Sequence, residues 1–475
     1  MPERPCWLLM DQGGNSSRAL LVDERGSVLG EGRRPVATRE AGGDRVEQDG
    51  TAILADLQAS VAEAVSACPD GHGLAGAGLA VQRGSILCWD KDSGRPLSPV
   101  LSWRDRRTSA QAWPRDLPGR VRRTAGLRFS PYGGAPKLRW CLDELPAVRT
   151  AARQGRLCMG PLGAFLARGL TGSGEDFVDP TLAQRTLLFS RTLQDWDETL
   201  LTSFGLQRAQ LPVLRPSRHD FGALQAAPCR LSLLMGDQNA VPLQCGETTA
   251  DTVYINAGTG AFILRPLSDP LEDPESTPFQ LSQLPPLSVD GPPRWALEGS
   301  IHGAASALNW FARAEGQERI PHPALTEALM TTGDRPLFIN TIDGLGSPWW
   351  QPGPAPAFLY AAGSDHLQRL AAVLDSIAFL LRVNLEAMEA AGGPVRVVRL
   401  SGGLSHCDGF CQHLANLTGR PVQRLEGGEA TAMGLLALLV GGGFSVPACS
   451  EFTPARDEAL RTRYHVWLDH MPALE

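Results

Sequence analysis

The sequence predicts an α/β protein made of two related domains, and three observations support this prediction. The chain has 475 residues, more than a single hydrophobic core usually serves. Strands alternate with helices towards the C-terminus, which is typical of an α/β sheet. A unit of strand, glycine-rich turn and strand occurs at 7–22 and again at 253–264, which indicates two similar domains facing one cleft. We place the boundary near Gly246, giving domains 1–246 and 247–475.

The N-terminal half begins with short apolar runs separated by Gly and Asp turns, the pattern of an antiparallel meander. Residues 49–67 have apolar side chains at helical spacing, with Asp49 as the expected N-cap. The run 86–89 and the turn 90–94 indicate a further hairpin. Strands are thus expected at 7–10, 19–22, 28–30, 74–81 and 86–89.

The C-terminal half repeats this logic and adds helices. Segments 265–293 and 346–356 are rich in proline and are predicted to be long surface loops. The expected strands are 253–256, 261–264, 395–400 and 421–425, and the expected helices are 408–417 and 430–440.

Composition limits the partners and the compartment. The net charge is −7 and no long basic run occurs, which argues against nucleic acid or an anionic membrane as the main partner. The ten cysteines are scattered without a CxxC pair, as expected for reduced thiols in the cytoplasm. The run 7–10 is too short for a signal peptide and the run 430–444 is too short to span a bilayer. We therefore expect a cytoplasmic protein.

The turn that follows Asp11 has the composition of a phosphate-binding hairpin. Its glycines let backbone N–H groups approach an anion closely, and Ser16 and Arg18 add donors suited to phosphate oxygens. Asp11 stands at a strand end, where a carboxylate could hold Mg²⁺. An ordinary β-turn is the alternative interpretation. The turn 258–260 offers the same chemistry, and two such turns could hold a polyphosphate from both sides.

Asp237 follows the apolar run 233–235, which would deliver a carboxylate into a loop near the domain boundary. A kinase needs a base for the proton of the attacking hydroxyl, and Asp can act as one. An Asx turn or helix N-cap is the simpler interpretation. Arg83, Trp103 and Tyr132 could line a pocket for a hydroxylated carbon chain, although a core position for Trp103 is the simpler interpretation. The His and Cys residues at 406–413 match no usual zinc spacing, so a packed helix is preferred to a metal site.

The order of these motifs over nearly the whole chain resembles the FGGY carbohydrate kinases, and most of all the glycerol kinases among them. Each matching segment is modest alone, and the ordered set carries the resemblance. The segments are 11–18, 46–49, 82–83, 102–107, 236–238, 257–260, 296–299, 344–348, 401–403 and 429–432.

The resemblance implies two actin-like (ribonuclease H-like) ATPase domains flanking a central cleft, with ATP and Mg²⁺ as cofactors and a homo-oligomer, such as a dimer, as the assembly. It implies that Asp237 is the general base and that Asp11 and Asp237 serve the metal. It assigns ATP and its phosphates to Gly13, Gly14, Asn15, Ser16, Arg18, Gly258, Thr259, Asn309, Gly403 and Cys407. The polyol or sugar falls to Arg83, Gly84, Trp103, Tyr132, Asp237, Gln238 and Phe262.

The chain departs from the glycerol-kinase pattern at several of these positions. The pattern has Glu where Gly84 stands, Thr at Gly14 and Asn15, Asn at Cys407 and Gln at Asn309. No counterpart of the loop that binds a sugar-bisphosphate inhibitor occurs between Phe221 and Leu231. The expected function is ATP-dependent phosphorylation of a small polyol or sugar, with glycerol as the leading acceptor. A kinase for a pentulose or tetritol is one alternative, and a catalytically impaired ATP-binding regulatory module is the other.

Overall fold

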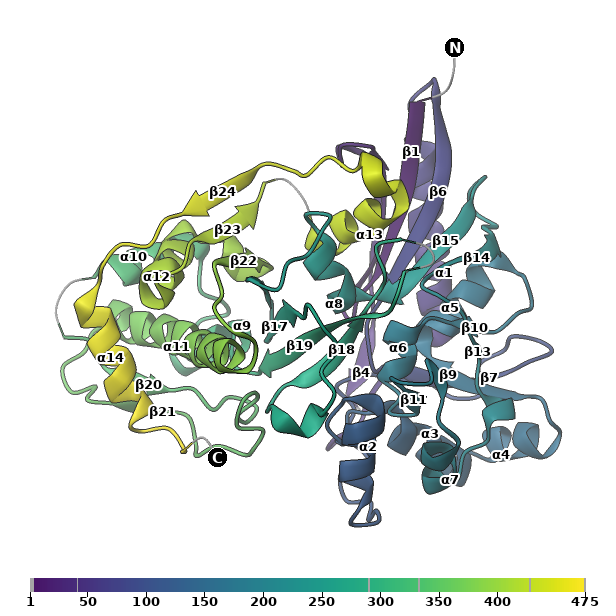
Figure 1. The fold of residues 1–475 in the computed structure, drawn as a ribbon, viewed down its shortest axis with the longest axis horizontal. Helices are drawn as coiled ribbons and strands as arrows, with labels where there is room; N and C mark the ends of the chain where they lie inside the picture. The colour runs from purple at the N-terminus through teal and green to yellow at the C-terminus, as the bar shows by residue number, and fades with distance from the viewer. Residues whose placement is uncertain (1–3, 41, 289–290, 332–333, 427–428, 474–475) are drawn as a thin grey trace.

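The computed structural model describes the chain except residues 1–3, 41, 289–290, 332–333, 427–428 and 474–475. Two lobes lie side by side, and each is built on one large mixed sheet (Figure 1). The N-terminal sheet has the strand order β14-β15-β6-β1-β2-β3, and the C-terminal sheet has the order β18-β19-β17-β16-β22-β23-β24. Each sheet starts from a strand–turn–strand unit, as the sequence predicts.

In the N-terminal sheet, β1 pairs antiparallel with β2 and parallel with β6, and β15 continues the parallel set beside β6. Helix α1 (Gly50–Ser66) packs on β3, where Gly32 is required because a Cβ would lie 2.1 Å from the Ser60 carbonyl oxygen. Asp49 caps this helix by accepting from two backbone N–H groups, as expected. The strands are β1 (Arg4–Gln12), β2 (Ser16–Asp23), β3 (Val28–Pro35), β6 (His72–Val81), β14 (Arg218–Ala223) and β15 (Arg230–Gly236).

A smaller five-stranded sheet and a set of short helices complete this half. The sheet consists of β4 (Thr38–Glu40), β5 (Val46–Gln48), β8 (Val100–Leu101), β7 (Ile86–Asp90) and β9 (Leu157–Pro161). The helices are α2 (Leu117–Ala125), α3 (Gly134–Glu144), α4 (Pro146–Arg153), α5 (Leu162–Thr171), α6 (Pro180–Gln184), α7 (Glu198–Phe204) and α8 (Asp237–Ala240). Two further sheets have two strands each. One consists of β10 (Phe177–Val178) and β13 (Val213–Leu214), and the other of β11 (Phe189–Ser190) and β12 (Asp195–Trp196).

The C-terminal half repeats the arrangement of its partner, because β22 lies parallel to β16 as β6 lies parallel to β1. The sheet consists of β16 (Thr252–Ala257), β17 (Ala261–Pro266), β18 (Gln280–Leu284), β19 (Arg294–Ile301), β22 (Val397–Ser401), β23 (Val422–Leu425) and β24 (Cys449–Phe452). The helices are α9 (Ala305–Ala314), α10 (His322–Met330), α11 (His366–Gly392), α12 (Asp408–Thr418), α13 (Ala430–Val440) and α14 (Glu458–Leu468), with a β20 (Leu337–Ile339) and β21 (Ala357–Leu359) pair beside them.

Helix α13 comes from the C-terminal half but packs on the N-terminal sheet. Its Leu435 and Leu436 join Leu9 and Leu20 in one buried apolar cluster. Gly434 permits the close contact, because a Cβ there would lie 2.0 Å from the Ala240 carbonyl oxygen. Burial of this apolar surface stabilises the docking of the two halves beside the hairpin that follows β1.

The prediction of a surface loop over 265–293 is wrong in part. Residues Gln280–Leu284 form β18, whose four last residues are buried. Gln184 explains this burial, because its side chain donates to the Leu281 carbonyl at 2.6 Å and accepts from the Gln283 N–H at 3.0 Å. The strand is thus fixed by partners distant in sequence, which local composition does not show. The segment 346–356 agrees with the prediction, since only an isolated bridge at Gln351 interrupts it.

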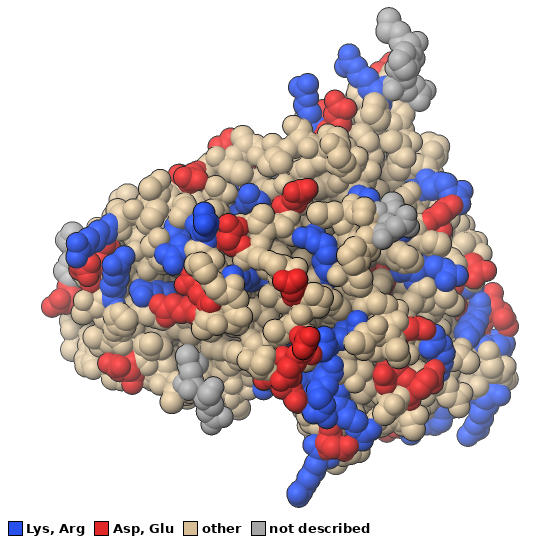
Figure 2. All heavy atoms as spheres, viewed as in Figure 1, with Lys and Arg blue, Asp and Glu red and all other residues tan. Residues whose placement is uncertain are grey.

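Charged side chains of both signs are interspersed over the face in Figure 2. Across the described part of the chain, none of the helices combines the length and the apolar character needed to cross a membrane.

Candidate active site

Three parallel strands of the N-terminal sheet end at one edge, and the residues after them form the centre of the candidate site. Gln12 of β1 and Gly236 of β15 both align with Val81 of β6. The hairpin after Gln12, Arg83 after β6 and Asp237 after β15 therefore meet. Sites in α/β sheets commonly lie beyond the carboxyl ends of the strands, for this geometric reason.

The hairpin between β1 and β2 is held by buried glutamine side chains. The Gly13 N–H donates to the Ser16 carbonyl at 3.0 Å and closes the turn. Gln12 donates to the Gly13 carbonyl at 3.0 Å, and Gln48 donates to the Gly14 carbonyl at 2.8 Å. With its carbonyl side fixed in this way, the turn has the character of a backbone anion site.

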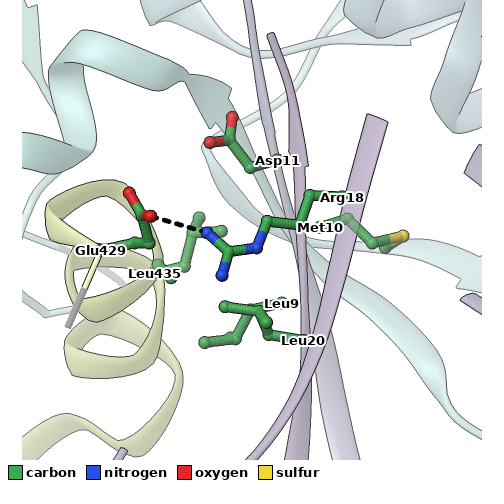
Figure 3. Close-up of a pocket in the computed structure, with 8 residues that line it drawn as sticks. Leu9, Met10, Asp11, Arg18, Leu20, Glu429 and Leu435 are labelled. Atoms are coloured by element: carbon green, nitrogen blue, oxygen red, sulfur yellow. Dashed lines mark ion pairs between the residues drawn. The ribbon is translucent and has the colours of Figure 1, made fainter. Parts of the chain in front are cut away.

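Arg18 stands opposite Asp11 in the β1–β2 ladder and reaches across to α13. Its Nη1 lies 2.8 Å from Oε1 of Glu429, and its Nε lies 2.9 Å from Oε1 of Glu31. Figure 3 shows this ion pair beside Asp11, with Leu9, Leu20 and Leu435 around it. Burial, followed by the charges of Asp237 and Glu429, raises the pKa of Asp11 to about 7. Glu31 and Glu429 therefore already pair with the guanidinium of Arg18, which is expected to contact phosphate.

Asp237 opens the short helix α8 at the end of β15. The N–H of Gly236 donates to the Thr181 hydroxyl at 2.8 Å, and the Gln238 N–H donates to Oδ1 of Asp237 at 2.7 Å. Burial raises the pKa of Asp237, and the charge of Arg83, whose Nε is 3.8 Å from Oδ1, opposes that rise. A partly buried carboxylate with a raised pKa is suited to accept a proton.

Arg83 is fixed by a carboxylate from the other half of the molecule. Its two terminal nitrogens lie 2.7 and 3.0 Å from the two oxygens of Glu298 on β19. Arg185 shares Oε2 of Glu298 at 2.6 Å. Burial alone would raise the pKa of Glu298, but the two arginines lower it to about 2, so Glu298 is anionic. The same cluster leaves only the Nε edge of Arg83 facing Asp237.

The expected acceptor residues lie around this cluster. Trp103 and Tyr132 are each 39% exposed, so their rings are available at the surface and are not core residues. The ring of Phe262 lies under the Arg83 guanidinium, 5.4 Å from centroid to Cζ. Gly84 has φ +75°, and a Cβ there would lie 3.5 Å from both Trp103 Cβ and the Tyr132 carbonyl oxygen. A side chain would fit in space at position 84, but the backbone favours glycine.

The second glycine-rich turn lies against the N-terminus of α9. The carbonyls of Gly258 and Thr259 accept from the N–H groups of Ala305 and Ser306 at 3.1 and 2.9 Å. Thr259 and Asn309 are exposed, as a nucleotide site on this surface requires.

Gln238 and the residues after β22 complete the list of predicted positions. Gln238 accepts from the Asn256 side chain at 3.0 Å and thus connects Asp237 to β16. Gly403 is exposed, and a Cβ there would meet no atom within 4 Å. Cys407 is only 3% exposed, and its thiol lies 3.4 Å from the Thr326 hydroxyl. Its described contact is therefore with α10.

Four residues with structural roles at the site were not singled out from the sequence: Arg185, Glu298, Glu429 and Lys137. Glu298 and Glu429 lie within motifs of the resemblance but received no role. Glu298 could have been found from the sequence, because it is a charged residue in a strand with apolar residues on either side, at 295–297 and at Ile301. Arg185 and Lys137 give no comparable local signal.

Asp11 and Asp237 are the residues that could hold a divalent cation. Asp237 contributes to the raised pKa of Asp11, so a cation between them would relieve a repulsion present in this structure. The described residues contain no group of three or more His, Cys, Asp or Glu that could hold a metal. Two carboxylates suffice for Mg²⁺ in kinases, since phosphate oxygens and water complete its shell.

Two domains of this topology, each with a strand–turn–strand unit and a parallel third strand beside it, define the actin-like ATPase fold. Residues 6–253 match the N-terminal domain of the FGGY family of carbohydrate kinases, and residues 253–440 match its C-terminal domain. The chain belongs to the FGGY family of carbohydrate kinases and is an ATP-dependent sugar or polyol kinase by that membership.

Individual relatives agree with this assignment. A glycerol kinase of Rhodospirillum rubrum is 34% identical over 460 residues, covering 94% of this chain and 92% of that protein. A glycerol kinase of Thermus brockianus is 34% identical over 90% and 88% of the two chains. The structure of Plasmodium falciparum glycerol kinase with ADP has a TM-score of 0.87 at 20% identity, with 99% of each chain covered. A xylulose kinase from Lactobacillus acidophilus has a TM-score of 0.84 at 16% identity over 98% and 97%. The two structures support the fold.

Proposed function

We propose that this protein transfers the γ-phosphoryl group of ATP to a hydroxyl of a small polyol, with glycerol as the leading acceptor. The observation that carries the proposal is the partly buried Asp237 carboxylate, which lies beside Arg83 where the ends of β1, β6 and β15 meet. The names of the curated relatives support glycerol.

Each residue then has a definite task. Asp237 takes the proton of the acceptor hydroxyl, and the hydroxyl oxygen attacks the γ-phosphorus of ATP. The bond between that phosphorus and the bridging oxygen then breaks, and ADP leaves. Arg83, Trp103, Tyr132, Gln238 and Phe262 orient the acceptor, and the two glycine-rich turns hold the phosphates. Asp11 and Asp237 would hold Mg²⁺, which would neutralise charge on the phosphates when bound.

Replacement of the base tests the proposal. Asp237→Asn should lower acceptor-dependent ADP release by at least a hundredfold while ATP still binds, as measured by coupled assay and calorimetry. Asp220→Asn is the control, because Asp220 is exposed and paired with Arg230 away from the site. Near-full activity of Asp237→Asn would show that the base is assigned wrongly.

A second acceptor class is favoured by Gly84. The glycerol-kinase pattern has a carboxylate here, and its loss removes a charged hydrogen-bond partner for a hydroxyl, about 1.5–3 kcal/mol. A pentulose or tetritol has additional atoms that could occupy this space. Initial rates on a panel of glycerol, tetritols and ketoses would decide between them, and a clear preference for glycerol would remove this candidate.

The same panel also tests the alternative of a regulatory module. Tight ATP binding without turnover of any acceptor would support that alternative. We further propose a cytoplasmic homo-oligomer. The ten cysteines are scattered along the sequence without a CxxC pair, which supports a reducing compartment. Light scattering of the purified chain would give the oligomeric state.

A further inference from the structure

Lys137 is a fully buried lysine that the proposed chemistry leaves without a task. It lies in the first half of α3 and has no solvent exposure. Its Nζ donates to the Gly84 carbonyl at 3.0 Å and to the Ser102 carbonyl at 2.8 Å. A buried amine is costly, so two well-placed acceptors are what makes this position tolerable.

The two carbonyls belong to the chain segments that carry the acceptor-binding side chains. Gly84 directly follows Arg83, and Ser102 directly precedes Trp103. The first segment leads into β7 and the second leaves β8, and these two strands pair antiparallel with Ile86 opposite Leu101. The amine therefore bonds both segments just beyond the end of that short ladder, where the strand pairing stops.

The charges around Lys137 do not account for the burial of its amine. The charge of Asp105 acts on the amine, but the Asp105 carboxylate is already bonded to Arg107 at 2.8 Å and to the Val46 N–H at 2.7 Å. Within the part of the chain that the structure describes, the amine donates only to these two main-chain oxygens. Because carbonyls accept from an amine in either protonation state, this connection persists whether or not Lys137 carries a charge.

We propose that Lys137 is a positioning residue that sets the distance between Arg83 and Trp103 and so determines acceptor affinity. The proposal rests on the acceptor site assigned above. It concerns the backbone at Gly84 and Ser102, and the lysine itself does not touch the substrate.

The first test replaces the amine with a side chain of similar length. Lys137→Met should raise the KM for the acceptor at least tenfold and change the KM for ATP less than twofold. The matched control is Cys141→Ala, one turn further along α3 and equally buried. This control should lower the melting temperature and leave both KM values unchanged, since its thiol bonds neither carbonyl in the described contacts. An unchanged acceptor KM in Lys137→Met would overturn the proposal.

A second variant protects the test against misfolding. Ser85→Ala removes only the hydroxyl that accepts from the Trp103 N–H at 3.0 Å. It should raise the acceptor KM by a smaller factor, about two- to fivefold, and leave the KM for ATP unchanged. If Lys137→Met does not fold and Ser85→Ala leaves the acceptor KM unchanged, the proposal is overturned.

Hydrogen exchange gives a readout that needs no activity. In Lys137→Met, the amides of residues 84–86 and 102–104 should exchange at least tenfold faster than in the wild type, while those of β16 stay protected. Equal protection would refute the connection even if no acceptor were turned over. Absence of turnover in the wild type would instead count against the proposed function alone.

Discussion

Arg83 and Glu298 form a two-point ion pair between the halves of the molecule, with distances of 2.7 and 3.0 Å. Arg83 follows β6 of the N-terminal sheet, and Glu298 lies in β19 of the C-terminal sheet. Both side chains are nearly inaccessible, at 6% and 2% exposure. Arg83, to which we assign acceptor binding as a proposal, therefore takes its position only when the two halves are docked.

Removing the charge of Glu298 should be strongly destabilising. Glu298→Gln leaves two buried arginines, Arg83 and Arg185, without their shared carboxylate. Breaking a buried pair in this way costs about 3–5 kcal/mol. Urea unfolding should show this loss, and kcat/KM for the acceptor should fall at least tenfold.

An exposed ion pair provides the comparison for that variant. Glu63 pairs with Arg34 at 2.6 Å, and both side chains are more than one-third exposed. Glu63→Gln should change the free energy of unfolding by less than about 1 kcal/mol. A similar small effect of Glu298→Gln would mean that the cluster does not hold the halves together.

Glu429 is expected to weaken ATP binding in the wild-type protein. Its carboxylate occupies Nη1 of Arg18 and adds negative charge near Asp11. Glu429→Gln removes both effects, so the KM for ATP should fall about two- to fivefold, which corresponds to under about 1 kcal/mol. The KM for the acceptor and the melting temperature should hardly change, because Glu429 is 64% exposed. A higher KM for ATP would instead show that Glu429 is needed to place Arg18.

Lys137 should make stability rise with pH above neutrality. Burial lowers its pKa from 10.5 to about 7, with Asp105, Arg107 and Cys141 as the neighbours that modify the shift. Between these values the unfolded chain holds one more proton, so the free energy of unfolding increases by up to about 1.4 kcal/mol per pH unit. Lys137→Met removes this contribution. Urea unfolding at pH 7, 8 and 9 should show a steeper rise for the wild type, and parallel profiles would contradict the expectation.

The sequence was most informative where a residue follows a strong local pattern. Asp49 was found because it precedes a segment with helical spacing of apolar residues, and Asp237 and the glycine-rich hairpin were found because apolar runs end at them. The structure places Asp237 where three strands converge. Strand β18 and Arg185 were missed for the opposite reason. Their positions depend on partners such as Gln184 and Glu298, about 100 residues away in the chain. Such long-range bonds have no local periodicity to reveal them.

Gly84 should decide how well glycerol is used. Gly84→Glu returns a carboxylate to the space beside Trp103 and Tyr132, where a Cβ would make ordinary contacts at 3.5 Å. The left-handed backbone at φ +75° will cost about 1–2 kcal/mol of stability. We expect kcat/KM for glycerol to rise about ten- to a hundredfold, because a hydrogen bond to a charged group contributes roughly 1.5–3 kcal/mol. Gly84→Ala is the matched control, since it carries the same backbone strain without the carboxylate. If both variants change glycerol turnover equally, the effect is strain and position 84 does not select the acceptor.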